Sequence, residues 1–587
     1  MKRLFEFLSG LPATLVGGAF LAASLALMLL KIEVPAYLNP AWAAVIICGY
    51  PLLYLAIRRI FVNKGMSKIS SALLISIAMI ASIAIGELFA AGEVAFIMAL
   101  GGILEEKIVA RAQKGLKQLI SLQPAQGRKI VGGKEETVPI AQVALGDVLR
   151  VLPGEAIPVD GEILSGNTSV DQSIMTGESL PVDKALGDSV FCGTINRFGS
   201  VDIRATKVGE DSSLQKLIRM VKEAENNKAP MQRIVDKWAA WLVPAALLIA
   251  IVTYLITRDI TRAVTILVVF CPCALALATP TSIMAAIGQA TKHGVIIKSG
   301  DALERMGKVD CVAFDKTGTL THGELYVSDV EGDVLQLAAS LERYSEHPIA
   351  KAIVEHYNGE YLEVQNFLAT PGVGVEGIVG GRHVMIGRNI EVTSDGVFAG
   401  KIIVKDRPKA SGAETVKRLL DMGVRAVMLT GDNRQTAQAV ATQAGIADEN
   451  VFAGLLPAQK VEMIRQLQRQ GRSVCMIGDG VNDAPALKTA DVGVAMGGMG
   501  SDIAVEAADI ALMGDDISKI PYLKRLSNAT VRLIKFNISL SMCINLVAIV
   551  LSVLALLNPI TGALVHNAGS VLVVLNAALL YDRKSGR

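Results

Sequence analysis

Three aspartates stand at the ends of short apolar segments that have the length of β-strands. Asp315 ends VDCVAFD, Asp432 follows AVMLTG, and Asp479 follows SVCMIG. These segments alternate with amphipathic stretches, which predicts a parallel α/β sheet with carboxylates gathered at the carboxyl ends of its strands. Asp315 precedes Lys316 and a turn rich in Gly and Thr, so it can serve as an acyl-phosphate nucleophile. A strand-terminal Asp by itself is more often a helix cap.

Two carboxylates beside one Mg²⁺ ion fit this chemistry. The cation would bridge phosphate and protein oxygens, and Asp315 can attack a phosphate only if the repulsion between the two anions is neutralised. A divalent cation beside Asp315 would therefore be needed before this residue could be phosphorylated.

A second chemical signature lies inside an apolar run, where VVFCPCAL places Cys271 and Cys273 on either side of Pro272. In an intact helix, side chains two positions apart point about 200° away from each other, so they could not share an ion. Proline removes a backbone donor and clashes with the preceding turn, which predicts an unwound segment where the thiols converge. Thiolates select soft metals. The alternative is that both cysteines are small apolar fillers.

The elements that must position these residues include membrane helices. The chain has 587 residues, of which 51% are hydrophobic and 19% charged, and its mean hydropathy is +0.45, too apolar for a soluble protein of this length. The apolar runs predict about eight spans, because a span needs about 20 residues. They cover residues 11–30, 41–57, 71–86, 91–104, 241–256, 263–279, 537–557 and 563–580.

Basic residues beside these runs predict the orientation. Those near the chain start, after the second span and after the fourth fall on one side, which the positive-inside rule makes cytoplasmic. Arg258 and Arg262 run against the rule. We expect a multi-pass protein of the plasma membrane with its large polar blocks in the cytoplasm. A net charge of +2 without basic runs excludes nucleic acid as a partner, and seven scattered cysteines predict reduced thiols.

Four short strings occur in a particular order along the chain. They are TGES at 176–179, DKTGTLT at 315–321, TGD at 430–432 and GDGVND at 478–483. In these strings the sequence resembles the P-type ATPases. The resemblance implies that Asp315 is the phosphorylated aspartate, that Glu178 positions the water that hydrolyses the aspartyl phosphate, and that Asp479 binds Mg²⁺. It also implies catalytic roles for Thr317, Thr430, Asp432 and Lys460, the last of which would meet phosphate charge.

A further set of motifs narrows the resemblance to the heavy-metal P-type ATPases, to which the Cys-Pro-Cys string also belongs. Ser-Glu-His-Pro at 345–348 implies that Glu346 and His347 contact adenine. Gly372, Gly374 and Gly387 would let the backbone approach the nucleotide. ATP and Mg²⁺ are the implied cofactors, and a soft metal cation is the implied cargo. No Cys-x-x-Cys or His-rich segment precedes the first apolar run, so we expect no appended metal sensor.

The resemblance also implies the fold class and the domain order. We expect a polytopic α-helical membrane protein with a β-rich actuator domain and an α/β phosphorylation domain that carries an inserted α+β nucleotide-binding domain. The expected boundaries are 1–109 for four membrane helices, 110–235 for the actuator, 236–286 for two more helices, 287–322 and 406–530 for the phosphorylation domain, 323–405 for the insertion, and 531–587 for the last two helices.

The last two spans should complete the site for the transported ion, because polar groups inside a membrane are expensive and usually functional. We take Asn545, His566 and Asn567 as candidate ligands. The copper(I) branch typically has Tyr-Asn in one span and Met with paired serines in the other, and the zinc branch has a Lys and an Asp; neither set is complete. An imidazole favours Zn²⁺ or Cd²⁺, although His566 could instead be an interfacial residue.

Three alternatives stay open at this point. The cargo could be Cu(I), since two thiolates neutralise a monovalent ion more easily than a dication. Cys-Pro-Cys could be structural in a pump with another cargo. The chain could also be a phosphohydrolase on an inert membrane anchor, which would leave the TGES string and the membrane thiols unexplained.

Overall fold

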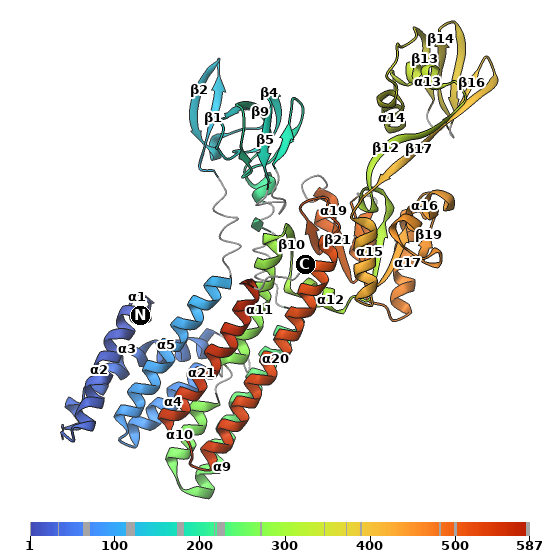
Figure 1. Ribbon diagram of the computed structural model, residues 1–587. Helices are drawn as coiled ribbons and strands as arrows, with labels where there is room; N and C mark the ends of the chain where they lie inside the picture. The colour runs from blue at the N-terminus through green and yellow to red at the C-terminus, as the bar shows by residue number, and fades with distance from the viewer. Residues whose placement is uncertain are drawn as a thin grey trace. The chain divides into compact units, whose positions relative to one another are not determined.

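The computed structural model describes most of the chain. The described residues are 2–32, 34–62, 71–112, 124–172, 181–215, 218–219, 229–270, 273–345, 347–370, 373–387, 390–479, 483–497 and 502–582. They form two compact units, one of residues 1–308 with 522–587 and the other of residues 309–521. Figure 1 shows the elements of both units by label.

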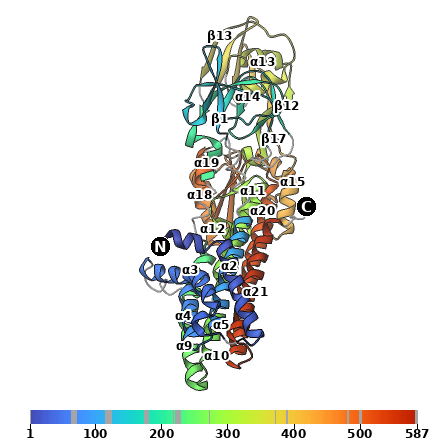
Figure 2. The same cartoon turned by 90° about the vertical axis from the view of Figure 1, so that its left-hand side faces the viewer.

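Helices make up one part of the first unit (Figure 2). The chain enters it through a short helix, α1 (Lys2–Leu8), and later elements interrupt the helical series twice. The remaining helices are α2 (Leu11–Leu29), α3 (Ala41–Val62), α4 (Ser71–Ala84), α5 (Leu88–Ala112), α9 (Pro230–Thr257), α10 (Ile260–Val269), α11 (Cys273–Lys292), α12 (Gly300–Lys308), α20 (Lys519–Val553) and α21 (Pro559–Ala578).

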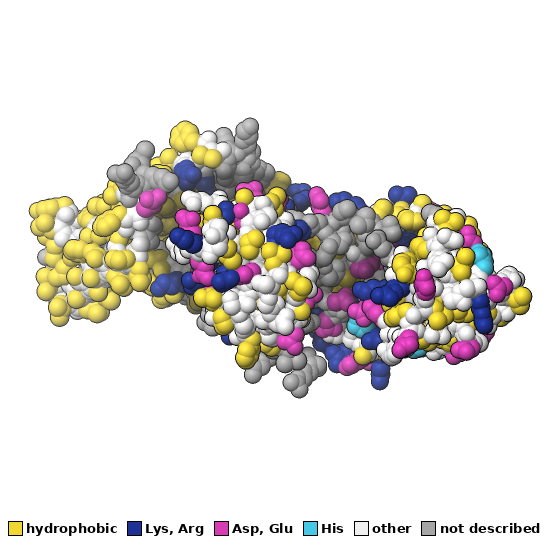
Figure 3. All heavy atoms as spheres, turned by 90° about the horizontal axis from the view of Figure 1, so that it is seen from above, with side chains coloured by type: hydrophobic (Ala, Val, Ile, Leu, Met, Phe, Trp, Pro, Cys, Tyr) yellow, Lys and Arg dark blue, Asp and Glu magenta, His cyan; other side chains and the backbone are white. Residues whose placement is uncertain are grey.

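Four of these helices are long and apolar enough to cross a membrane, namely α2, α3, α20 and α21 with its short extension to Tyr581. Shorter apolar helical segments lie at Ile75–Ala84, Leu88–Leu104, Trp241–Thr257 and Ile260–Val269. The helices expose large hydrophobic side chains such as Phe20 and Leu248, and Figure 3 shows a mostly hydrophobic surface at one end of the view. Lipid-facing helices need such a surface.

Helix α20 begins well before the apolar run that predicted it. Its first turns carry Lys519, Lys524 and Arg525 among apolar residues, so the hydropathy of the segment is too low to identify a span. Lys524 is buried and donates hydrogen bonds to the carbonyls of Met306 (3.2 Å) and Gly307 (2.8 Å). Similarly, α11 continues to Lys292, past the predicted boundary at 286.

The helix that carries the Cys-Pro-Cys string is interrupted there. Helix α10 ends at Val269, and α11 begins at Cys273. Cys271 and Pro272 lie outside the described residues. Helix α21 packs against both α10 and α11, and Gly562 allows close contact because a Cβ there would lie 2.8 Å from a methyl group of Val269.

Arg262, one of the two residues that ran against the orientation rule, caps a neighbouring helix. Its guanidinium donates to Asp259 (3.1 Å) and to the carbonyl of Val553 (2.9 Å), the last residue of α20. A cation at a helix carboxyl end is stabilised by the partial negative charge of the unpaired carbonyls. The position of Arg262 therefore has a local structural reason.

The first unit also contains a β-rich domain. One sheet has the strand order β2-β1-β3-β9-β4-β7, and a smaller sheet has the order β6-β5-β8. Alternating buried Val, Ile and Leu side chains, including Leu149, Ile163 and Ile203, form its core. The strands are β1 (Gln126–Val131), β2 (Lys134–Pro139), β3 (Val148–Val151), β4 (Asp160–Ser165), β5 (Thr168–Asp171), β6 (Val182–Lys184), β7 (Ser189–Val190), β8 (Ile195–Asn196) and β9 (Val201–Lys207).

The second unit is built on a parallel sheet whose strands run in the order β22-β21-β20-β11-β18-β19. These are β11 (Cys311–Asp315), β18 (Arg425–Leu429), β19 (Val451–Phe452), β20 (Val474–Gly478), β21 (Val492–Ala495) and β22 (Ile510–Leu512). The connecting helices are α15 (Gly412–Asp421), α16 (Arg434–Ala444), α17 (Pro457–Arg469), α18 (Ala484–Thr489) and α19 (Asp502–Ala507). This arrangement confirms the predicted α/β sheet.

An antiparallel sheet with the order β12-β17-β16-β15-β14-β13 is inserted after β11. Helices α13 (Leu335–Glu342) and α14 (Pro348–His356) accompany it. The chain enters through β12 (Thr321–Glu331), continues through β13 (Val364–Thr370), β14 (Gly374–Val379), β15 (Arg382–Gly387) and β16 (Glu391–Ser394), and returns through β17 (Val397–Pro408). Because β12 and β17 pair with each other, they form a two-stranded hinge beneath the inserted sheet.

Candidate functional site

The parallel sheet brings the three strand-terminal aspartate segments together. Strand β11 lies between β18 and β20, with Asp315 opposite Leu429 and Phe314 opposite Ile477. Thr430 and Asp479 follow directly on these neighbouring strands. The order of the chain reverses on either side of β11, and in open α/β sheets such a reversal marks the place where ligands bind.

Four charged side chains meet at this edge. The Nζ of Lys460, on α17, donates to Asp315 Oδ1 at 2.5 Å and to Asp483 Oδ1 at 2.7 Å. Asp315 is 6% exposed and Asp483 3%. Oxygens of Asp315, Asp479 and Asp483 lie within 4.8 Å of one another, a spacing and donor set that fit a hard divalent cation such as Mg²⁺.

The environment shifts the pKa of three groups in this cluster, Asp315, Asp479 and Lys460. Burial raises the pKa of Asp315, and Asp483 adds to this effect, while Lys460 opposes it. Burial also raises the pKa of Asp479. For Lys460, burial disfavours the charge, but Asp315 and Asp483 outweigh it and raise its pKa above the ordinary lysine value. A bound cation would oppose the raised pKa values of Asp315 and Asp479 by favouring their ionised forms.

The turn that follows Asp315 lies directly against Asp479. Gly318 has φ +69°, and a Cβ at this position would lie 1.6 Å from Asp479 Oδ2. Thr317 is exposed, and Thr319 is fully buried with a hydroxyl that has no partner among the described residues. Glycine is thus required at 318 both by the backbone conformation and by the space available.

The other residues predicted for this site lie around the four charged side chains. Lys316 Nζ pairs with Asp432 at 2.5 Å and approaches Asp406 at 3.7 Å. The hydroxyl of Thr430 accepts a hydrogen bond from the Asp432 N–H at 3.1 Å. In the structure Asp432 therefore engages Lys316.

A cavity of about 510 Å³ in the inserted sheet collects the predicted nucleotide residues. His347 lines it and accepts a hydrogen bond from the Ile349 N–H through Nδ1 (3.2 Å), which leaves Nε2 free. Gly374 pairs with Gly387, and a Cβ at Gly374 would lie 2.0 Å from the Ile386 carbonyl. The cavity is lined by Glu342, Ser345, His347, Ile349, Ala369, Thr370, Val373, Gly374, Val375, Ile386, Gly387 and Ile390.

Two residues of these sites were not predicted. Glu342 lines the nucleotide cavity; it is 6% exposed, and one carboxylate oxygen has no partner among the described residues. Burial raises its pKa to about 7, while a hydrogen bond with Ser345 opposes this shift. Asp483 was visible in the GDGVND string, but its contact with Lys460 depends on how α17 packs.

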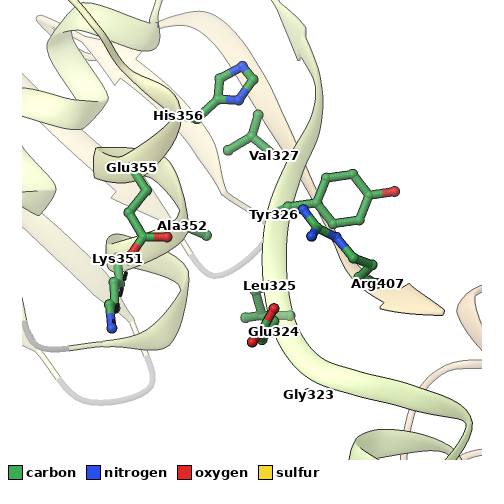
Figure 4. Close-up of a pocket in the computed structure, with 10 residues that line it drawn as sticks. All are labelled: Gly323, Glu324, Leu325, Tyr326, Val327, Lys351, Ala352, Glu355, His356 and Arg407. Atoms are coloured by element: carbon green, nitrogen blue, oxygen red, sulfur yellow. Dashed lines mark ion pairs between the residues drawn. The ribbon is translucent and has the colours of Figure 1, made fainter. Parts of the chain in front are cut away.

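A second cavity, of about 540 Å³, lies between α14 and the hinge strands (Figure 4). It contains none of the predicted site residues. Its wall includes the Arg407 guanidinium, which lies 5.7 Å from the centre of the Tyr326 ring. Charged side chains of both signs surround it: Glu324, Lys351, Glu355, His356 and Arg407.

In the membrane helices, His566 and Asn545 line one small cavity of about 10 Å³, large enough for a single water molecule or ion. His566 is 4% exposed, which does not fit an interfacial residue. Its ring lies close to the backbone of Val269, at the end of α10, and its Nε2 has no partner among the described residues. Ser570 lines the same cavity and also has an unpartnered hydroxyl.

Asn567 lies on a different side of α21. Its amide nitrogen contacts Met98 Sδ at 3.6 Å and donates to the Ala563 carbonyl at 3.2 Å. Its Oδ1 lies against Gly101 of α5. The structure therefore brings Asn545 and His566 together but places Asn567 against α5.

Several predicted residues cannot be placed. Glu178, Glu346, Gly372 and Cys271 lie outside the described residues, and the side chain of Cys273 does as well. Their roles remain predictions.

Comparisons with known proteins agree with this architecture. Residues 121–222 match the P-type ATPase actuator domain, and residues 309–491 match the haloacid dehalogenase-like hydrolases. One similar solved structure is the crystal structure of a zinc-transporting PIB-type ATPase in the E2·Pi state, with a sequence identity of 30% and a TM-score of 0.62. The match covers 97% of this chain and 99% of the chain in that structure. The chain belongs to the heavy-metal, or PIB-type, P-type ATPases.

Curated relatives carry a different metal in their names. The copper-exporting P-type ATPase of Staphylococcus haemolyticus is 41% identical over 527 residues, which are 82% of this chain and 66% of the relative. That of Staphylococcus saprophyticus is 38% identical over 526 residues, with the same shares. The chain thus spans 66% of the length of these relatives. The names copper and zinc belong to those proteins, and the family alone does not distinguish between them for this chain.

Proposed function

We propose that this protein exports a transition-metal cation across a membrane, driven by ATP hydrolysis through an aspartyl phosphate. The main support is the cluster at the sheet edge, where Lys460 holds Asp315 beside Asp479 and Asp483. A buried carboxylate that is held by a cation and borders further carboxylates is arranged for phosphoryl transfer rather than for capping a helix.

In the proposed reaction, an Asp315 oxygen forms a bond to the γ-phosphorus of ATP while the β,γ-anhydride bond breaks and ADP leaves. Lys460 orients the attacking carboxylate and offsets part of its repulsion from the phosphate. When bound, Mg²⁺ would be held by Asp315 and Asp479 and would neutralise phosphate charge. Glu178 would then activate a water molecule that releases inorganic phosphate from Asp315.

We place the nucleotide in the cavity of the inserted sheet. His347 Nε2 and the Glu342 carboxyl can meet the polar edge of a base, and the paired backbones of Gly374 and Gly387 leave room for it. Glu346 and Gly372 belong to the same proposal. The hinge formed by β12 and β17 connects this cavity to the turn that carries Asp315.

We place the cargo at Cys271, Cys273, Asn545 and His566. The Nε2 of His566 is buried and has no partner among the described residues, so it is available to bind a metal ion. This nitrogen favours a borderline divalent ion such as Zn²⁺ or Cd²⁺. Cu(I) is the second candidate, because the curated relatives are named for copper.

The test measures two properties of the purified protein under reducing conditions, in the presence of Zn²⁺, Cd²⁺ or Cu(I). The first is the rate of ATP hydrolysis, and the second is the formation of an acid-stable, hydroxylamine-sensitive phosphoenzyme from radiolabelled ATP. Stimulation by Zn²⁺ or Cd²⁺ above Cu(I) supports the divalent cargo, and the reverse order supports Cu(I). The double variant Cys271→Ala, Cys273→Ala should lose metal stimulation but keep labelling of Asp315 by inorganic phosphate. Cys543→Ala is the matched control, because Cys543 is exposed on α20.

Two outcomes contradict the proposal. Absence of any label at Asp315 with every metal would remove the phosphorylation mechanism and leave a membrane-anchored hydrolase. Full metal-stimulated turnover in the double cysteine variant would remove the thiol site while keeping the pump.

A further inference from the structure

A third buried lysine, Lys409, lies at the end of the returning hinge strand. It follows β17 directly and is 6% exposed. Its Nζ donates to the Gly318 carbonyl at 2.8 Å and to Asp515 Oδ1 at 2.5 Å. Its backbone N–H donates to the Leu320 carbonyl at 2.9 Å. One residue therefore holds the turn after Asp315 at two carbonyls.

The turn that Lys409 holds is also tightly packed on its other side. Gly318 is packed so closely on Asp479 that even a methyl group would overlap the carboxylate. A displacement of the Gly318 carbonyl would therefore move the glycine relative to Asp479, one of the carboxylates proposed to hold Mg²⁺. In an interior packed at high density, such small displacements pass directly from neighbour to neighbour.

The three lysines around the turn have different partners. Lys460 reaches the nucleophile itself, and Lys316 pairs with Asp432. Among the described residues, Lys409 forms no hydrogen bond with Asp315 or Asp479, but it connects the hinge to the turn. Burying an ammonium is costly unless its protons are bonded, and Lys409 meets that need with one backbone carbonyl and one carboxylate.

We propose that Lys409 is a positioning residue for phosphoryl transfer, which holds Gly318 against Asp479 and so fixes the turn and the divalent-cation site when the hinge strands are paired. The inference rests on the proposed function, since it assigns Lys409 to the same reaction. It also gives the hinge a route to the reaction centre: β17 moves with the inserted sheet, and Lys409 is attached to its end.

The test compares Lys409→Met, Lys409→Arg and the control Lys405→Met, which removes an exposed lysine from the same strand. Methionine keeps the length of the side chain but donates no hydrogen bond. We expect Lys409→Met to slow phosphoenzyme formation from ATP and from inorganic phosphate by about 10-fold or more and to raise the half-saturating Mg²⁺ concentration. Lys409→Arg should recover part of the loss, and Lys405→Met should match the wild type.

A second measurement does not depend on turnover. Binding of Mn²⁺, used as a paramagnetic substitute for Mg²⁺, is followed by electron paramagnetic resonance in the full chain, and the thermal midpoint is recorded in parallel. We expect about 10-fold weaker Mn²⁺ binding in Lys409→Met. A variant that binds Mn²⁺ and forms phosphoenzyme like the wild type overturns the inference, even if its thermal midpoint falls.

These two measurements separate the failure of this inference from the failure of the proposed function. If wild-type protein forms no hydroxylamine-sensitive phosphoenzyme, the proposed function fails, and Mn²⁺ binding alone then decides the role of Lys409. If wild type is phosphorylated and Lys409→Met is equal to it in both measurements, the proposed function stands and the role of Lys409 is rejected.

Discussion

At the scale of single residues, the site is controlled by how closely its groups approach one another. The carboxylates of Asp315, Asp479 and Asp483 form one cluster that also contains the Lys460 ammonium. Gly318 packs directly against Asp479 in this cluster. Because these groups are packed in direct contact, small changes in side-chain size should have large effects.

The first prediction concerns Gly318. Gly318→Ala forces a methyl group against Asp479 and also strains a backbone with φ +69°. Gly323→Ala is the matched control, because Gly323 has φ +73° but no atom closer than 3.7 Å to the added methyl group. We expect labelling of Asp315 to fall about 100-fold in Gly318→Ala and far less in Gly323→Ala. Equal losses in both variants would show that backbone strain, and not displacement of Asp479, is responsible.

The second prediction concerns Glu342, whose buried carboxyl has a pKa raised from 4.5 to about 7. Between these values the folded protein keeps a proton that the unfolded chain has lost, so stability falls as pH rises through this window. Glu342→Gln removes the buried charge. We expect it to raise the thermal midpoint at pH 8 but to have little effect at pH 5, in the absence of nucleotide.

Glu355→Gln serves as the control for this experiment, because Glu355 is exposed on the neighbouring helix α14. It should leave the midpoint unchanged at both values of pH. A Glu342→Gln variant that is no more stable than wild type at pH 8 would contradict the assignment of a buried charged form.

Sequence reasoning reached Asp315 and Asp479 because parallel strands place their carboxyl ends at one edge whatever the details of packing. It reached Lys460, on helix α17, only through the resemblance to the P-type ATPases. It missed Asp483 and Glu342 because their importance depends on burial. Glu342 is the last residue of the short helix α13, a position that surface glutamates often occupy. Only the packing of α13 on the inserted sheet makes Glu342 a cavity residue.

At the scale of elements, apolar runs located the membrane helices but not their ends. Helix α20 starts at Lys519, and its buried Lys524 finds carbonyl partners in α12; no hydropathy pattern contains that information. The end of α10 at Val269 and the start of α11 at Cys273 lie on either side of the position where the sequence predicted a break, while Cys271 and Pro272 themselves lie outside the described residues.

The third prediction concerns Arg262, which binds the carboxyl end of α20 from the first turn of α10. Arg262→Met removes the cation and its hydrogen bond to Val553. We expect the protein to lose about 1–2 kcal/mol of stability, measured as a lower thermal midpoint in detergent. Arg258→Met, which replaces an exposed arginine, should have a much smaller effect.

At the scale of the whole molecule, the predicted fold class is confirmed, with actuator-like and α/β parts that each have their own core. The β-rich domain, the parallel sheet and the inserted sheet bury separate clusters of hydrophobic side chains. What the sequence could not provide is the identity of the cargo. His566 and Asn545 line one cavity, but Cys271 and the side chain of Cys273, the proposed thiol ligands, lie outside the described residues.

The pairing of Thr321 with Pro408 has a consequence for protein engineering. The two ends of the inserted segment leave the parallel sheet as neighbouring strands, so their backbones are only about 5 Å apart. A loop of a few glycines and serines could therefore replace the segment between them without disturbing the sheet below. Such a shortened chain should be phosphorylated at Asp315 by radiolabelled inorganic phosphate but not by radiolabelled ATP, and the two labelling experiments are compared directly. Labelling by ATP at the wild-type rate would mean that the nucleotide is recognised elsewhere.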